Sequence, residues 1–334
     1  MIINSTQAGV TASSTKVAEL WENLSNTLNK VLNGFKIIFA GGGFSVNYGN
    51  SVTGISSNVS YNKTLAETSK INLFLNSNAR LNSVTDIISG TSAPRLGGAI
   101  NLSSFPNLQQ FRCVGNDINS VTGYENNSNI THFIVSDNEL TGSMPTLITF
   151  ANLVEFKCET NQLTGSIPTL NGLSFLQTFV CASNQLTGSI PALSTTTNLR
   201  NFYCSFNQLT GPLPSLSGLT KLLVFHAGNN GFTGSIPVLS GCPLLNDFRV
   251  PNCQLTSFAG GSVSNTLGQF LAQNNQLTST AVNAILAAFV AAGRTSASGT
   301  CILNLAGTGN SSATGQGITD KDTLIARGWT VTIN

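Results

Sequence analysis

Two histidines and a short acidic run are the parts of this sequence that could do proton chemistry. His132 and His226 each lie beside a phenylalanine, and Glu155 and Glu159 flank Lys157. Paired carboxylates can act as a general acid and base, but a solvated charge set on a strand face is far more common. Neither histidine belongs to a metal-ligand cluster or a nucleophile motif. We therefore predict surface positions for these side chains, with no catalytic, metal or cofactor site.

The cysteines are the second candidates for chemistry. There are seven, an odd number, and no C-x-x-C spacing occurs, so neither a full disulfide framework nor a metal site is indicated. Four recur at one position of a repeated unit, namely Cys113, Cys158, Cys181 and Cys204. Buried cysteine behaves as a small hydrophobic residue. Core packing is therefore predicted over redox function, and it fits assembly in a reducing cytoplasm.

A segment of 22 or 23 residues repeats along the chain and must position these side chains. ETNQLTGSIPTL, ASNQLTGSIPAL and SFNQLTGPLPSL recur in phase. Alignment on their asparagine gives the column Asn116, Asn138, Asn161, Asn184, Asn207, Asn230 and Asn275, with Cys253 and Thr308 as substitutes. A unit this small cannot bury its own apolar edge, so successive coils must stack and share one core.

Each unit combines a short strand with a turn. In the unit around Asn184, Phe179 and Cys181 alternate with polar or small neighbours, which indicates a strand with one buried face. Glycine and proline then turn the chain. Because an asparagine side chain both donates and accepts, it can satisfy backbone groups where the coil bends. We predict a solenoid of about nine units over residues 84–334, with the asparagines in a ladder.

These units resemble leucine-rich repeats, and their LTGxIP motif is similar to the subtype of plant receptors. The resemblance implies a parallel strand ladder on a concave face, with irregular or 3₁₀ segments behind it. The chain differs from those receptors because it shows no secretory signal, no paired-cysteine caps and no transmembrane or kinase segment. Plant receptor biology is therefore not expected to transfer.

Helical patterns near the C-terminus are expected to cap the stack. Ser279 is a candidate N-cap for a helix that runs through Ala292 and stops at Gly293. Thr319 starts a capping-box pattern for a shorter helix ending near Gly328. A last strand-like segment follows. Together these would seal the open end of the solenoid, which such arrays require for solubility.

Residues 1–83 have a different pattern and are predicted to form a small α+β anchoring module, with strands near 37–40 and 71–75. Apolar residues spaced alternately by four and three in a candidate helix are Val17, Trp21, Leu24, Leu28, Val31 and Phe35. This spacing is typical of a coiled-coil seam, so the module could form a homo-oligomer. The alternative is a helix that packs on its own domain.

The outward strand positions of the solenoid carry the best signal for binding. An aromatic and aliphatic cluster with two basic neighbours is expected there, formed by Val180, Tyr203, Phe206, His226 and Arg249. Such a cluster on a rigid ladder is a plausible contact patch on the concave face. The alternative is a set of scattered surface hydrophobic residues, which are normal.

Composition excludes two kinds of partner. Only 8% of the residues are charged and the formal net charge is +2, and the sequence has no cluster of lysine and arginine, so nucleic-acid binding is not expected. No apolar run reaches the length of a membrane span, so membrane insertion is not expected either.

The sequence suggests three functions. The first is a bacteriophage virion component, such as a tail, fibre or capsid-decoration protein, located in particles assembled in the host cytoplasm. The composition, with few charged residues and much Ser, Thr, Asn and Gly, resembles that of such proteins. The ending GQGITDKDTLIARGWTVTIN resembles theirs as well. Its partners would be other virion proteins or a host-surface protein or glycan. The second is a bacterial surface adhesin or soluble protein- or glycan-binding module, and the third is a glycan-active enzyme, which would require clustered acids.

Overall fold

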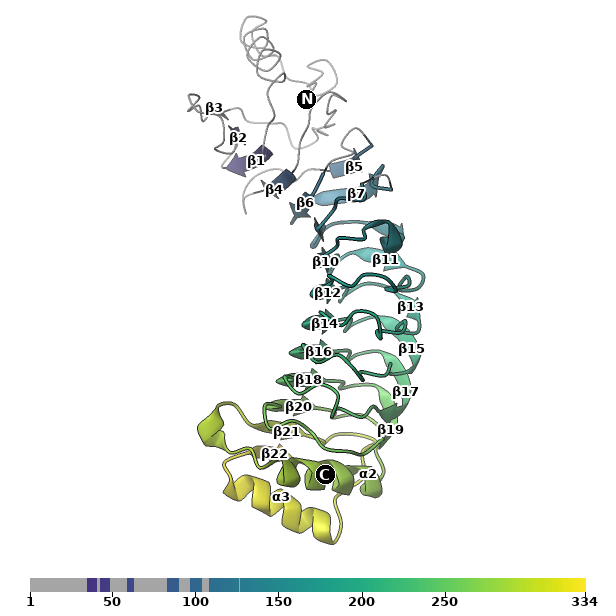
Figure 1. The fold of residues 1–334 in the computed structure, drawn as a ribbon, viewed down its shortest axis with the longest axis vertical. Helices are drawn as coiled ribbons and strands as arrows, with labels where there is room; N and C mark the ends of the chain where they lie inside the picture. The colour runs from purple at the N-terminus through teal and green to yellow at the C-terminus, as the bar shows by residue number, and fades with distance from the viewer. Residues whose placement is uncertain are drawn as a thin grey trace, which may run out of the picture. The chain divides into compact units, whose positions relative to one another are not determined.

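The computed structural model describes residues 35–40, 43–48, 59–62, 83–89, 97–103, 108–125 and 127–334 (Figure 1). The chain divides into two compact units, each described here by itself. Unit 1 comprises Met1–Thr141 and Thr149–Gln162, and unit 2 comprises Gly142–Ile148 and Leu163–Asn334. Three short elements contain residues of both units, namely β9 (Thr141–Ser143), the 3₁₀ turn η1 (Leu147–Thr149) and β11 (Gln162–Thr164).

Unit 1 joins an antiparallel start to a parallel ladder. Its strands are β1 (Phe35–Ala40), β2 (Gly43–Tyr48), β3 (Val59–Asn62), β4 (Ser83–Ser89), β5 (Gly97–Asn101), β6 (Gln110–Val114), β7 (Asp117–Thr122), β8 (His132–Ile134) and β10 (Glu155–Lys157). β1, β2 and β3 pair antiparallel. β1 also pairs parallel with β4, and the ladder continues parallel through β6, β8 and β10. β5 and β7 form a separate parallel pair.

The predicted N-terminal module falls largely outside the described residues. This holds for the helix positions Val17 to Val31 and for the strand at 71–75, whereas Phe35 begins β1. Self-association through the helix and the module boundary at residue 83 therefore stay predictions.

Unit 2 is a parallel β-solenoid, as the repeat predicted. Its main ladder consists of β12 (Thr178–Val180), β14 (Asn201–Tyr203), β16 (Val224–His226), β18 (Asp247–Arg249), β20 (Gln269–Leu271), β21 (Ile302–Asn304) and β22 (Thr330–Thr332). Each strand pairs parallel with the next, with equivalent residues side by side. A second parallel ladder, on the other side of the coils in Figure 1, consists of β13 (Thr187–Gly188), β15 (Gln208–Pro212), β17 (Gly231–Ile236) and β19 (Gln254–Phe258).

A stack of phenylalanines forms the centre of the unit 2 core. The middle residue of each strand from β12 to β20 points inward, giving Phe179, Phe202, Phe225, Phe248 and Phe270, all with no exposed surface. Neighbouring rings stack with centroids 5.3–5.5 Å apart. Since one ring in each coil meets the ring of the next, the core is continuous although each coil is short.

The asparagine column ties the coils together by hydrogen bonds. The Asn207 side-chain oxygen accepts from the Leu186 N–H at 3.0 Å, and its amide nitrogen donates to the Cys181 and Cys204 carbonyls at 3.0 and 3.1 Å. Asn230 repeats the pattern one coil later. The same column contains Asn116, Asn138 and Asn161 in unit 1, and Asn184 and Asn275 in unit 2. Backbone groups left over at the bend are satisfied in this way.

The last member of the column differs from the prediction. Asn310, rather than Thr308, takes the place, because its side-chain oxygen accepts from the Leu277 N–H at 2.9 Å and its amide donates to the Ala272 carbonyl at 2.9 Å. Helix α2 (Ser279–Ala292) and the loop after it lengthen this unit, so spacing alone no longer fixes the alignment. The Thr308 N–H instead donates to Asn274.

The C-terminal helices also begin elsewhere than predicted. Thr278, not Ser279, caps α2, with its hydroxyl accepting from the Ala281 N–H at 3.2 Å, and Gly293 ends that helix in the left-handed conformation as expected. Helix α3 (Gln316–Ala326) begins before Thr319, so the capping box does not form. The residue before it is Gly315, with a φ of 50°, and no side chain caps the helix.

Candidate functional site

The main ladder of unit 2 exposes one continuous face. In each strand from β12 to β20 the middle phenylalanine is buried, so the first and third residues point to the opposite side. We call the first and third residues of β12 to β20 the strand face; its members are Thr178, Val180, Asn201, Tyr203, Val224, His226, Asp247, Arg249, Gln269 and Leu271. Because the strands are one strand spacing apart, side chains from several coils can meet there.

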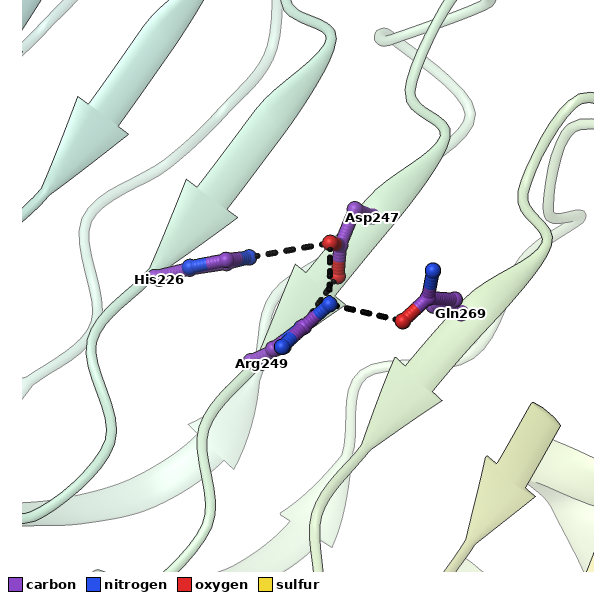
Figure 2. Close-up of polar contacts among 4 residues, drawn as sticks. All are labelled: His226, Asp247, Arg249 and Gln269. Carbon is purple, nitrogen blue, oxygen red and sulfur yellow. Dashed lines mark hydrogen bonds and ion pairs between the residues drawn. The ribbon is translucent and has the colours of Figure 1, made fainter.

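Asp247 lies at the centre of a polar network on the strand face. Arg249 binds its carboxylate through two nitrogens, with Nε to Oδ1 and Nη2 to Oδ2 both at 2.7 Å. His226 Nε2 lies 3.1 Å from Oδ2, and Arg249 Nη2 also donates to Gln269 Oε1 at 2.6 Å. Figure 2 shows that these four side chains come from three neighbouring strands and converge on one another. The bidentate pair fixes both orientation and position.

Tyr203 extends the network to a fourth coil. Its ring meets the His226 ring edge-on, with centroids 4.8 Å apart and planes at 85°. We call Tyr203, His226, Asp247, Arg249 and Gln269 the Asp247 network. Edge-to-face contacts between rings are favourable, so the imidazole is held between an aromatic ring and a carboxylate.

The electrostatics of the network favour one charge state. Burial alone would raise the pKa of Asp247, but the hydrogen bonds and charges of His226 and Arg249 outweigh it and hold this pKa below its ordinary value of 3.8. Burial and the nearby Asp247 carboxylate raise the pKa of the Tyr203 hydroxyl. Asp247 therefore stays ionised at neutral pH, while Tyr203 keeps its proton and can donate a hydrogen bond.

The lowered pKa of Asp247 predicts an acid-dependent loss of stability. Its ionised form is favoured by folding, so its contribution is present above pH 3.8 and is lost as pH falls through the lower folded pKa. We expect Asp247→Asn to lower the free energy of unfolding by about 1 kcal/mol relative to the parent at neutral pH. That difference should shrink below pH 3.8. Melting temperatures of both proteins across this range check it, and a gap that is constant with pH would contradict it.

The structure gathers only some of the predicted binding residues. Tyr203, His226 and Arg249 meet in the Asp247 network. Val180 was expected on the exposed face but keeps only 8% exposure, because this short side chain lies beside its larger ladder partner Tyr203. Phe206 is 59% exposed, yet it lies beyond the end of β14 and outside the network.

Sequence reasoning missed Asp247 and Gln269, although a signal was present. Asp247 stands two residues before Arg249, and side chains two apart in a strand share a face. His226 and Gln269 occupy the outward positions of the adjoining coils. Apart from Phe206, the prediction considered only the third residue of each strand, whereas the network also includes residues from the first position.

The other residues considered for chemistry form local contacts. In unit 1, Lys157 pairs with Glu155 at 2.5 Å, and His132 Nδ1 lies 2.9 Å from the Thr131 hydroxyl. All seven cysteines are buried, and none of them forms a disulfide bond. Burial raises the pKa of Cys113 to about 12, and a protonated thiol is unreactive. Within the described residues no group of His, Cys, Asp and Glu is arranged to hold a metal ion.

Across the described part of the chain, no helix combines the length and the apolar character needed to cross a bilayer.

Comparison with known proteins defines the fold class. No protein-family model and no characterised relative matches the sequence. Among solved structures, the leucine-rich-repeat ectodomain of the Arabidopsis receptor kinase HAESA, solved with an IDA peptide hormone, is 23% identical with a TM-score of 0.52. That alignment covers 61% of this chain and 35% of the ectodomain. The chain therefore has a leucine-rich-repeat fold.

Two further structures are similar at lower scores. The plant peptide hormone receptor RGFR1, solved with RGF2, is 24% identical over 60% of this chain and 37% of its own, with a TM-score of 0.48. YopM from Yersinia enterocolitica is 18% identical over 59% and 41%, with a TM-score of 0.42. This chain thus spans less than half the length of each of these structures.

Proposed function

We propose that this chain is a non-enzymatic binding protein that recognises another macromolecule through the strand face of unit 2. The observation that carries the proposal is the Asp247 network, in which five side chains from four coils are held in one arrangement. Tyrosine and arginine are the residues that most often dominate binding interfaces. Side chains fixed before binding lose less conformational entropy when the partner arrives.

The same network argues for recognition over catalysis. An aspartate beside a histidine also orients the general base of hydrolases. Here Arg249 occupies both oxygens of the Asp247 carboxylate, and the His226 ring packs against Tyr203. These contacts hold the imidazole as part of a surface that donates and accepts hydrogen bonds.

The biological setting in this proposal is a bacteriophage virion. The chain would be a tail, fibre or capsid-decoration component that shows its solenoid to a host surface or to neighbouring subunits. The support is the sequence: the chain has few charged residues, is rich in Ser, Thr, Asn and Gly, and has an ending that resembles such proteins. Several copies on one particle, or in one homo-oligomer, would turn weak contacts into stable attachment. The alternative is a bacterial surface adhesin or soluble binding module, which the same strand face would also serve.

The proposal predicts that particles carrying the chain attach to host cells through the Asp247 network. In particles with the double change Tyr203→Ser and Arg249→Ala, we expect attachment to weaken at least about tenfold, a loss of about 1.4 kcal/mol or more. The physical reason is the loss of the aromatic anchor and of the guanidinium together. Attachment is measured by counting particles bound to cells.

Two controls make this test decisive. Lys221→Ala removes an exposed charge whose amine contacts Asn198 in a loop, and attachment should be unchanged. Mass spectrometry of purified particles must first detect the chain. A chain found with the bacterial surface and not in particles would rule out the virion role in favour of the adhesin. Unaltered attachment of the double variant would overturn the strand face as the contact.

A further inference from the structure

A column of residues at the corner after each main strand has left-handed backbone geometry. In unit 2 this corner column consists of Ser183, Phe206, Asn229, Asn252 and Asn274, each with φ between 54° and 58°. The column is continuous because the Phe206 N–H donates to the Gly228 carbonyl at 3.0 Å and the Asn229 N–H donates to the Pro251 carbonyl at 2.8 Å. Asparagine tolerates this geometry well, and most other L residues do not.

Phe206 is the exception in the corner column. Its ring is 59% exposed, the most exposed large hydrophobic side chain of the described residues. An aromatic residue neither favours positive φ nor gains core packing there, and the other coils show that the fold accepts small polar residues at this place. The position thus carries an exposed ring that the fold itself does not need.

The asparagines next to Phe206 form a directed chain of amides. Asn274 Nδ2 donates to Asn252 Oδ1 at 2.7 Å, and Asn252 Nδ2 donates to Asn229 Oδ1 at 2.8 Å. The amide nitrogen of Asn229 is the donor end of the chain, in the coil next to that of Phe206. Chains of hydrogen bonds polarise one another, which strengthens a donor at the end. An exposed aromatic ring and a strengthened amide donor therefore occupy neighbouring coils.

The chemistry of the corner column selects among ligands. All five residues are uncharged, and nucleic-acid strands that stack on aromatic rings also need a positively charged groove. A protein interface gathers its aromatic anchors near the centre of a contact patch, whereas Phe206 is the one aromatic residue among the five of the corner column. A sugar ring has an apolar C–H face that can lie on an aromatic ring, and hydroxyl groups around its edge that pair with amides.

From this arrangement we infer that the corner column is a glycan site: an uncharged oligosaccharide stacks one pyranose ring on Phe206 and extends along Asn229, Asn252 and Asn274. The site is separate from the strand face and does not rest on the proposed function. The corner column can therefore fail its binding test while the strand face passes its own, and the reverse is also possible.

The test is binding of three neutral hexasaccharides, chitohexaose, cellohexaose and maltohexaose, to the full chain by isothermal calorimetry. We expect at least one of them to bind, and Phe206→Asn to weaken it at least about tenfold. The same substitution should raise the melting temperature, because asparagine suits the left-handed conformation. Loss of binding with a gain in stability cannot come from unfolding. Asn252→Ser, which replaces the middle amide with a shorter hydroxyl and breaks the chain of amides, should also weaken binding.

The controls separate this site from other surfaces. Phe175→Ser removes a ring that is 54% exposed in a different part of unit 2 and should leave binding unchanged. The double change Tyr203→Ser and Arg249→Ala should leave it unchanged as well. Failure of the chain to bind any of the three sugars would overturn the inference, as would full binding by Phe206→Asn. A protein captured through Phe206 in place of a sugar would also overturn it.

Discussion

Replacing Phe225 with alanine is expected to lower the free energy of unfolding of the chain by about 3–5 kcal/mol. Phe225 has no exposed surface, and its ring stacks on Phe202 and Phe248 with centroids 5.4 and 5.5 Å away. Alanine would leave a cavity between two rings that are held apart by the backbone ladder and cannot close it. Urea unfolding followed by circular dichroism measures the change.

The location of the destabilised strands is as informative as the size of the loss in stability. In a solenoid each coil contacts only its neighbours, so hydrogen exchange should accelerate first in β14, β16 and β18. Phe225→Leu keeps most of the volume and should cost only about 1–2 kcal/mol, mainly from the two lost ring contacts. If Phe225→Ala and Phe225→Leu were equally stable, the phenylalanine stack would not be what holds neighbouring coils together. Uniform acceleration across unit 2 would contradict the nearest-neighbour account.

The repeat made most of the unit 2 fold predictable. Phe179 and Cys181 alternate with polar neighbours, and a period of two fixes which residues of a strand face inward. The constant interval between asparagines then fixes which residues of successive coils lie side by side. Two simple periods thus define the strands, the ladder and the core, and no knowledge of a relative was needed for them.

The prediction of the asparagine column failed where the regular interval between its members is interrupted. The insertion of α2 removed the register that had identified earlier members of the asparagine column, and Thr308 was aligned in place of Asn310. A second signal would have corrected it. Gly307 and Gly309 both have positive φ, 95° and 97°, so the left-handed residue before the column position does not separate Thr308 from Asn310. The side chain does separate them, because Asn310 carries an amide that can both donate and accept at this place. The type of side chain is therefore a better guide than spacing near an insertion.

The candidate site was less predictable because it depends on contacts between coils. Tyr203, His226 and Arg249 were identified one by one as outward residues. Their shared partner Asp247 becomes visible only when the first strand positions are laid beside the third ones. Sequence patterns give the face on which a side chain lies, but the choice of hydrogen-bond partner depends on rotamers that the repeat does not encode.

The asparagine column links the periodic sequence to a rigid face, because it holds the bend of each coil at the end of each strand. Asn207 alone joins three backbone segments: it accepts from Leu186 and donates to the Cys181 and Cys204 carbonyls. If the bend loosened, the strand before it would loosen too, and with it Tyr203. The binding surface therefore depends on buried polar contacts as much as on the phenylalanine stack.

Asn207→Leu is accordingly expected to lower the free energy of unfolding by about 2–4 kcal/mol, because it leaves the Leu186 N–H without its partner in a largely buried place. It also removes one of the two asparagine donors from each of the Cys181 and Cys204 carbonyls. The chain supplies its own matched control. Cys253 occupies the same column, where its thiol contacts the Ala227 and Pro251 carbonyls at 3.7 and 3.5 Å. Asn207→Cys should therefore cost less, about 1–2 kcal/mol.

The reciprocal change completes the argument. Cys253→Asn should raise the free energy of unfolding by about 1 kcal/mol, since an amide restores the stronger hydrogen bonds made in the neighbouring coils. All three variants are compared by urea unfolding at one pH. Because the thiol is a weak donor and leucine is none, the order of stability must be asparagine, cysteine, leucine at position 207. A leucine variant as stable as the parent would show that water satisfies the bend and that the column is not what holds the coils in register.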